Sequence, residues 1–522
     1  MAGLRSSGRE TVAAVALALI LGLHAAVVAH LVSRGLDHDE AEHLRAGEWM
    51  ASGRVLYRDF VENHTPFLYL VLSRFAPVDV DYDALRRYAT SARVLSAAAG
   101  TAAALCVAVF AAEVAGDWLA MIPALVALLG RGWTSDRSLL DIRSEPFTLL
   151  LFWAGVLLIT RDHLHGRKRA VLGGLGAGLV AAAMIWNPKW PLEALVIGAW
   201  YAASVWALAR RARLDAALSV AAACAAPLVA IAAALRVASP GALFFFGYRY
   251  PAAFYAWFRR SPLVPATFRF PGAFEYCSPW FGPAAAGAGI VLLIVVTRAR
   301  WPALQTRRRR LLLLLLGLTV AGALELRFVY SYPRLWPQYF VMWGCALAAV
   351  YGVAIAAAPV RTSLRVAVIA LAGVLFAGSE ISQLRGAVDE RQWRITEAIT
   401  AALRPGEGVA VVPDVCPLPA SAGSYYWYAY KDQVPFSLAY ARTPQGRRWL
   451  PPLSEADLPP CRMLDAHLHG LPRGAVYVRF VGDSIFRNLP QARGCLAALV
   501  RMGRAHEMGT SDVYEIDAPP RQ

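Results

Sequence analysis

Long apolar runs dominate this sequence and constrain its fold more than any other feature. Many of these runs reach about 16–24 residues, enough for a helix to cross roughly 30 Å of hydrocarbon. A transmembrane β-barrel would alternate apolar and polar residues one by one, and these runs do not alternate. The chain is 57% hydrophobic over 522 residues, with a mean hydropathy of +0.44, well above that of an ordinary soluble domain. The sequence therefore predicts a polytopic α-helical membrane protein.

We expect about eleven transmembrane helices. The first, Thr11 to Val32, lacks a small-residue cleavage site and precedes many further spans, so we interpret it as a retained helix and not as a signal peptide. The apolar run Pro66 to Pro77 is too short to cross the membrane and predicts an interfacial or re-entrant helix. The predicted spans are 11–32, 88–112, 117–133, 145–160, 170–186, 192–209, 216–236, 282–297, 311–326, 337–358 and 365–379.

The net charge of +16 comes from basic residues that gather between predicted spans. The clusters at 161–169, 210–213, 298–310 and 361–365 fall in alternate loops, as the positive-inside rule requires when the N-terminus is cytoplasmic. This pattern favours membrane topology over a nucleic-acid partner as the origin of the charge. It predicts a multi-pass protein of the cell inner (plasma) membrane, with its C-terminal part extracytoplasmic.

The composition changes sharply near residue 380. We expect a transmembrane domain at 1–379 and a small extracytoplasmic α/β domain at 380–522, whose short strands are predicted at 409–413, 475–480 and 511–516 and a helix at 489–502. Spacing alone does not settle how the tail cysteines pair. A bridge between Cys416 and Cys461 is one open pairing, with Cys495 left over.

Acidic residues stand where the chain leaves the predicted membrane. Asp39 and Glu40 open the first extracytoplasmic loop, 33–87, and a second acidic motif, Asp141 and Glu145, follows from the loop 134–144. Carboxylates at a membrane edge are functional candidates, because charge is costly there. They could act as a general base or hold a divalent cation. The plainer alternatives are a solvated loop and, for Glu145, a negative charge that stabilises a helix N-terminus.

Basic residues on the predicted outer side are candidates for binding a phosphate group. Arginine grips phosphate with two parallel hydrogen bonds, and lysine offers a compact charge. Snorkelling towards lipid headgroups is the alternative for each of them. The aromatic loop 240–280 is interpreted as an interfacial anchor. The candidates are Arg93, Arg137, Arg143, Lys189 and Arg334.

Over residues 10–200 the order of these motifs resembles the GT-C family of lipid-linked-sugar glycosyltransferases, which includes protein O-mannosyltransferases, aminoarabinose transferases and core-sugar transferases. A single Pro66 replaces the usual proline pair, and valine-leucine replaces the proline before Tyr57. The matching elements are Asp39-Glu40, Gly53, Tyr57-Arg58-Asp59, His64-Thr65-Pro66, Ala92-Arg93 to Gly100, Asp141 with Glu145, and Lys189.

The resemblance implies that a monosaccharide moves from a polyprenyl-phosphate donor to an extracytoplasmic acceptor with inversion. Asp39 would be the general base, and Glu40 would orient the acceptor or help to bind a cation. Asp141 and Glu145 would hold a divalent cation, Mg or Mn. The basic candidates would neutralise the departing phosphate, and Tyr57, Asp59 and His64 would belong to a substrate loop. Membrane lipids and the lipid-linked sugar are the expected partners.

The alternative function is a transporter or flippase-like protein for lipid-linked sugars. That class typically shows paired half-repeats and helices interrupted near the bilayer midplane. Here the two halves of the sequence are unlike, and the acidic residues fall at the predicted membrane edge. The sequence does not identify the sugar or the acceptor.

Overall fold

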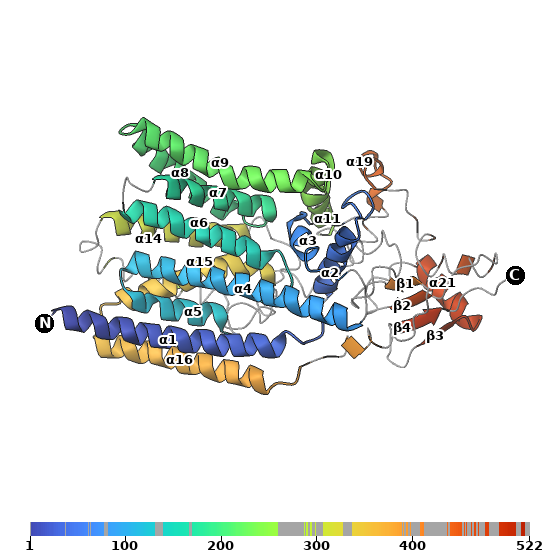
Figure 1. Cartoon of the computed structure of the whole chain (residues 1–522), viewed down its shortest axis with the longest axis horizontal. Coiled ribbons are helices and arrows are strands. Elements are labelled where there is room, and N and C mark those ends of the chain that lie inside the picture. The colour runs from blue at the N-terminus through green and yellow to red at the C-terminus, as the bar shows by residue number, and fades with distance from the viewer. Residues whose placement is uncertain are drawn as a thin grey trace. The chain divides into compact units, whose positions relative to one another are not determined.

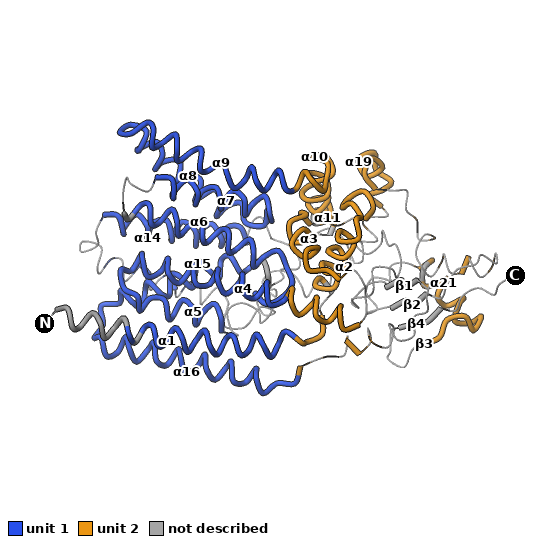
Figure 2. The backbone as a smooth tube through the Cα atoms, viewed as in Figure 1, with its two compact units in different colours: residues 1–32, 93–233, 261–387 blue, residues 33–92, 234–260, 388–522 orange. Residues whose placement is uncertain are grey.

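The computed structural model describes most of the chain in two compact units (Figure 2). Unit 1 comprises residues 1–32, 93–233 and 261–387, and unit 2 comprises 33–92, 234–260 and 388–522. The described residues are 2–36, 38–60, 64–77, 82–130, 139–165, 170–258, 306–326, 337–388, 408–411, 439–450, 476–479, 490–507 and 513–516, with single residues and pairs between these ranges.

Unit 1 is a bundle of long helices (Figure 1). Six helices in the described part are long and apolar enough to cross a membrane by length and composition, in agreement with the polytopic prediction. The bundle helices, in chain order, are α1 (Ala2–Leu31), α4 (Tyr82–Ala115), a 3-10 turn (Trp118–Ala120), α5 (Met121–Leu129), α6 (Glu145–His165), α7 (Ala170–Trp186), α8 (Pro191–Ala209), α9 (Arg213–Leu235), α14 (Thr306–Leu324), α15 (Pro337–Ala357) and α16 (Thr362–Arg385). The predicted span at 282–297 lies largely outside the described residues.

Small residues allow the closest packing in this bundle. Helices α6 and α7 share the most extensive contact, and a Cβ at Gly176 would stand 2.5 Å from the carbonyl oxygen of Gly155. Since hydrocarbon offers no hydrophobic drive for two helices to associate, such close backbone approach is how membrane helices gain packing energy. The short helix α5 packs against α1, α15 and α16 and is almost wholly buried.

Unit 2 contains the first loop, the start of the loop 240–280 and most of the tail, three segments that the sequence places outside the membrane. Its helices are α2 (His38–Ala51), α3 (Phe67–Leu72), α10 (Pro240–Phe244), a π-helical turn (Phe245–Arg249), α11 (Tyr250–Phe258), α19 (Pro444–Arg447) and α21 (Pro490–Arg501). At six residues α3 is too short to cross a bilayer, which agrees with the interpretation of the run after Pro66. The stretch expected as a loop at 240–280 is helical over its described first half, because its aromatic rings pack together instead of lying singly in an interface. Phe245 stacks on Tyr440 and on Trp449, with ring centroids 6.1 Å and 5.5 Å apart.

A four-stranded sheet forms in the tail, in the order β1-β2-β4-β3. The first pairing is parallel and the other two are antiparallel. Three of these strands fall on the predicted strand segments. That 380–522 forms a separate domain stays a prediction. The strands are β1 (Gly408–Val411), β2 (Val476–Arg479), β3 (Ala505–Glu507) and β4 (Val513–Ile516).

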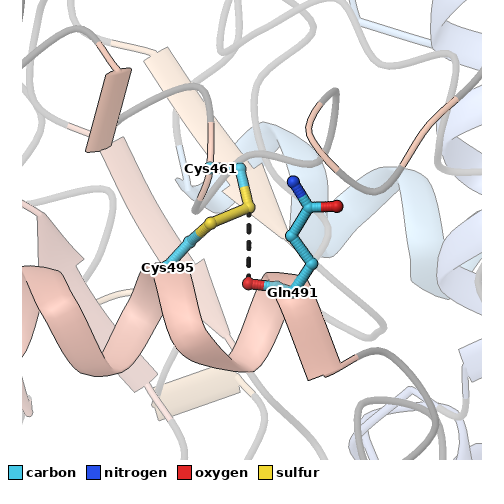
Figure 3. Close-up of a disulfide and its surroundings, with 3 residues drawn as sticks. All are labelled: Cys461, Gln491 and Cys495. Atoms are coloured by element: carbon cyan, nitrogen blue, oxygen red, sulfur yellow. Dashed lines mark hydrogen bonds between the residues drawn. A yellow bond between two sulfur atoms is a disulfide. The ribbon is translucent and has the colours of Figure 1, made fainter.

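A disulfide joins Cys461 to Cys495 in α21 (Figure 3). The sulfur of Cys461 lies 3.6 Å from the carbonyl oxygen of Gln491 in the same helix. The alternative pairing of Cys461 with Cys416 is therefore wrong. Only folding brings residues 34 positions apart together, and the spacing of the cysteines carried no sign of it. Cys416 lies outside the described residues.

Candidate active site

Helix α2 carries the acidic pair in its first turn. Asp39 is half-buried, whereas Glu40 is fully buried and lies 4.0 Å from the guanidinium of Arg34. The carbonyl oxygen of Arg34 accepts a 2.9 Å hydrogen bond from the buried indole of Trp393, which fixes the chain just before α2. The two carboxylates thus have different surroundings: Glu40 is held by a cation inside the protein, and Asp39 keeps contact with solvent.

The turn after α2 contains the predicted substrate-loop residues Tyr57 and Asp59. Asp59 accepts a 2.7 Å hydrogen bond from the backbone of Val55 and pairs with Arg58. The hydrogen bond from Arg58, followed by that from Val55, lowers the pKa of Asp59 to about 2. Asp59 is therefore ionised at neutral pH and is engaged in shaping the turn.

Tyr57 is buried and adopts a positive φ of 66°, which is rare for a residue with a side chain. Its ring stacks on Phe246 at 5.0 Å, and its hydroxyl donates to the carbonyl oxygen of His64. Burial, followed by the nearby Glu62 carboxylate, raises the pKa of Tyr57 well above its usual value. The hydroxyl therefore stays protonated as a donor, and Tyr57 positions His64 from within the fold.

We expect Tyr57→Phe to lower the free energy of unfolding by about 0.5–1.5 kcal/mol, because the partly buried hydrogen bond to the His64 carbonyl is lost. Chemical denaturation of the purified protein in detergent measures this change. Tyr248→Phe is the matched control, since this half-buried tyrosine makes no hydrogen bond through its hydroxyl within the described residues. An equal loss in both variants would contradict a specific role for the Tyr57 hydroxyl.

His43, Glu62 and His64 form a group with metal-ligand character in unit 2. One ligand atom from each residue lies within 4.8 Å of the others, and His43 and Glu62 are buried. The imidazole Nδ1 of His64 is 3.0 Å from Glu62, and that of His43 is 3.4 Å from the Tyr69 hydroxyl. Two imidazoles and one carboxylate are a donor set that suits zinc or a similar transition metal better than Mg. His43 also stands one helical turn after Asp39, on the same face of α2.

The second acidic motif lies in unit 1 and is engaged with basic partners. Asp141 is 3.3 Å from Arg143, and Glu145, the first residue of α6, forms an ion pair with Lys189. Both carboxylates are almost completely buried. Within the described residues, the group of three possible metal ligands falls on the first loop, and a cation at Asp141 with Glu145 stays a prediction.

A hydrogen-bond network ties this motif to the turn between α7 and α8. Asn187 donates to the Ser144 hydroxyl at 2.8 Å, and that hydroxyl lies 3.3 Å from the Glu145 carboxylate. Ion pair and network together fix the Lys189 side chain beside the start of α6. Lys189 is thus a positioned cation that already has a carboxylate partner.

Of the other basic candidates, only Arg93 lies within the described residues. Arg93 is buried in α4 and donates a 3.0 Å hydrogen bond to the carbonyl oxygen of Val32. A Cβ at Gly100, two turns further along α4, would lie 2.8 Å from the carbonyl oxygen of Leu139, just before Asp141. The spacing from Arg93 to Gly100 therefore has a packing reason, because glycine lets α4 approach the second acidic motif. Arg137 and Arg334 lie outside the described residues.

Sequence reasoning did not single out Glu62, Arg34 or Tyr69. Glu62 lies two residues before His64 inside the predicted substrate loop, and this proximity was the available signal. The partnership of Arg34 with Glu40 carried no sequence signal, because it depends on how the chain turns between α1 and α2. The acidic pair and Lys189 were singled out from the sequence, and the structure adds an ion-pair partner for Glu40 and for Lys189.

Together these features define a class: a polytopic helical membrane protein with ionised groups gathered in the segments between its spans. No model of a protein family matches the chain, and no curated protein sequence matches it. Among solved structures, it is similar to ArnT from Cupriavidus metallidurans bound to undecaprenyl phosphate, with a TM-score of 0.58 and 15% identity over 97% of this chain and 99% of that one.

A second solved structure is the archaeal oligosaccharyltransferase AglB from Archaeoglobus fulgidus, in complex with an inhibitory peptide and a dolichol-phosphate. Its TM-score is 0.45 at 13% identity, over 89% of this chain and 69% of that one. The similarity to ArnT extends over nearly the full length of both chains. The chain therefore shares the fold of ArnT over nearly its whole length, and the fold implied by the resemblance over residues 10–200 is confirmed.

Proposed function

We propose that this protein is an integral membrane glycosyltransferase that moves a monosaccharide from a polyprenyl-phosphate donor to an extracytoplasmic acceptor. The observation that carries the proposal is the acidic pair in the first turn of α2, with Asp39 half-buried and Glu40 held by Arg34. The proposal also draws on the fold shared with ArnT, whose solved structure holds undecaprenyl phosphate.

The reaction assigned to this site is an inverting displacement. Asp39 takes the proton from the acceptor hydroxyl while the acceptor oxygen forms a bond to the anomeric carbon. The bond from that carbon to the phosphate oxygen breaks, and its electron pair leaves with the polyprenyl phosphate. Glu40, neutralised by Arg34, orients the acceptor or helps to bind a cation. Because Arg34 balances its charge, Glu40 does not compete with Asp39 for the proton of the acceptor hydroxyl.

Basic side chains in unit 1 stabilise the leaving phosphate in this proposal. Lys189 and Arg143 each have a buried carboxylate partner, Glu145 and Asp141. The partner carboxylates hold the cations in place before the donor arrives, so less conformational entropy is lost when the phosphate binds.

The proposed cation ligands are His43, Glu62 and His64, whose donor set fits zinc or a similar metal. Such a cation would supply positive charge beside His43, which stands one helical turn after Asp39 in α2. Tyr57 and Tyr69 fix the orientation of this group through their hydroxyls. Asp141 and Glu145 remain the second candidate pair for a cation.

Transfer assays test the proposal directly. The purified protein in lipid nanodiscs is supplied with a panel of radiolabelled polyprenyl-phosphate sugars and a broad set of hydroxyl acceptors. Transfer of label from one donor supports a glycosyltransferase and identifies the sugar. Movement of the intact donor between leaflets, with no transfer to any acceptor, would favour the transporter instead.

We expect Glu62→Gln to weaken binding of zinc by about tenfold or more, because the group loses its only carboxylate ligand. Zinc retained after dialysis against a graded chelator series, measured by plasma mass spectrometry, reports the affinity without any assay of activity. Glu390→Gln is the control, since Glu390 forms a surface pair with Arg86 in the same unit. Equal retention by wild type and Glu62→Gln would remove this group as the cation site.

A further inference from the structure

A cavity of about 470 Å³ lies in unit 1 at the far end of α6 from Glu145. Asp162 and His163 of α6 line it, seventeen and eighteen residues after Glu145, which corresponds to about 26 Å along a helix. Within unit 1, the cavity thus lies apart from the second acidic motif, Asp141 and Glu145. Its volume is that of a pocket for a small organic ligand or a lipid headgroup.

Positive charge dominates the wall of this cavity. Among the described residues of the wall are Arg211, Arg307 and Arg310, against the single carboxylate of Asp162. Arg307 and Arg310 belong to a run of four arginines in the first turn of α14, a helix that has no acidic residue there. Positive side chains at a helix N-terminus oppose the helix dipole. A bound anion would offset both this conflict and the mutual repulsion of the arginines.

Polar atoms in the same wall lack partners. His163 Nε2 and Trp200 Nε1 are buried without a hydrogen bond within the described residues, and their rings meet edge to face at 5.5 Å. Beside them the hydroxyl of Tyr201 lies 2.9 Å from that of Ser219, and all four residues line the cavity. Leaving buried polar atoms unpaired costs free energy. A ligand with several acceptor oxygens would satisfy them.

The surface beside the cavity is apolar. Val205 and Leu208 line the cavity itself. Trp206 of α8 and Leu214 of α9 are 67% and 72% exposed, although both helices are long and apolar enough to cross a membrane. A ligand that binds here would place its phosphate among the arginines and its hydrocarbon part along α8 and α9.

From these observations we propose that the cavity is a binding site for the phosphate headgroup of an anionic membrane lipid. Basic pockets between transmembrane helices favour such headgroups, because arginine pairs with phosphate while the acyl chains stay in the bilayer. The arginines of this cavity are different residues from Lys189 and Arg143, which are proposed to bind the donor phosphate. The lipid would bind here without any chemical reaction.

Native mass spectrometry of the detergent-purified protein tests the site. We expect wild type to retain phosphatidylglycerol in preference to phosphatidylcholine, and the double variant Arg211→Gln/Arg310→Gln to bind phosphatidylglycerol about a hundredfold more weakly, roughly tenfold per arginine. Arg210→Gln is the matched control, because Arg210 is the neighbour of Arg211 but stacks over Trp206 and does not line the cavity. It should bind this lipid like wild type.

A second variant tests the cavity itself. Ala207→Phe adds a ring at an exposed position of its lining, so it should fold normally and exclude the lipid. Equal retention in wild type, the double variant and Ala207→Phe would overturn the proposal. Displacement of the lipid by millimolar inorganic phosphate would also overturn it, since the cavity would then bind a free anion and not a lipid.

Discussion

Asp39→Asn should reduce turnover by about 10²–10⁴-fold while the affinity for the lipid-linked donor changes little, because an amide cannot accept the acceptor proton. The structure gives this expectation its physical basis. Asp39 is half-buried in the first turn of α2, and the neighbouring Glu40 is already committed to Arg34. Single-turnover transfer in nanodiscs and a separate donor-binding titration measure the two quantities.

The matched control is Asp83→Asn, which alters an exposed aspartate in the first turn of α4. It preserves the charge change and the position in the first turn of a helix but leaves α2 and its acidic pair unchanged, so its turnover should equal that of wild type. Undiminished transfer by Asp39→Asn would remove Asp39 as the base. Parallel loss of donor binding and turnover would instead assign Asp39 a role in holding the donor.

Lys189→Met should destabilise the protein by about 3–5 kcal/mol, because it leaves the buried Glu145 carboxylate without its cation. The double variant Glu145→Gln/Lys189→Met removes both charges and should recover most of this loss. Unfolding in detergent, followed by the fluorescence of the buried tryptophans, measures both variants against wild type.

The same pair of variants separates stability from phosphate binding. If Lys189 also stabilises the leaving phosphate, the double variant regains stability but still transfers sugar slowly. If its transfer rate equals that of wild type, Lys189 serves only to neutralise Glu145. A Lys189→Met variant as stable as wild type would mean that the ion pair contributes nothing to the fold.

Hydropathy predicted much of this architecture. The thickness of the bilayer sets the length of the apolar run that a membrane helix needs. The predicted segment 170–186 therefore has the same ends as the observed helix α7. Strands such as β2 were predictable from alternating β-branched and aromatic residues. The helices α10 and α11 were missed; in α11, Tyr250 packs against Phe436 and Tyr440, rings that lie far away in the sequence.

The candidate site was predictable as residue types but not as partnerships. Asp39 and Lys189 stood out because charge at a membrane edge needs a reason. That Lys189 pairs with Glu145, and that Glu62 meets His43 and His64, depends on long-range folding that no spacing rule encodes. In the sequence Glu62 has the features of an ordinary loop residue, whereas in the structure it is buried beside the imidazoles of His43 and His64.

The bond between Cys461 and Cys495 bears on the side of the membrane that the tail occupies. Thiols stay reduced in the cytoplasm and become oxidised in the periplasm or outside the cell. A tail that carries this bond supports the outward orientation by a redox argument, which is independent of where the arginines lie. Insertion in the opposite sense would expose the tail to glutathione, which would keep both cysteines as thiols.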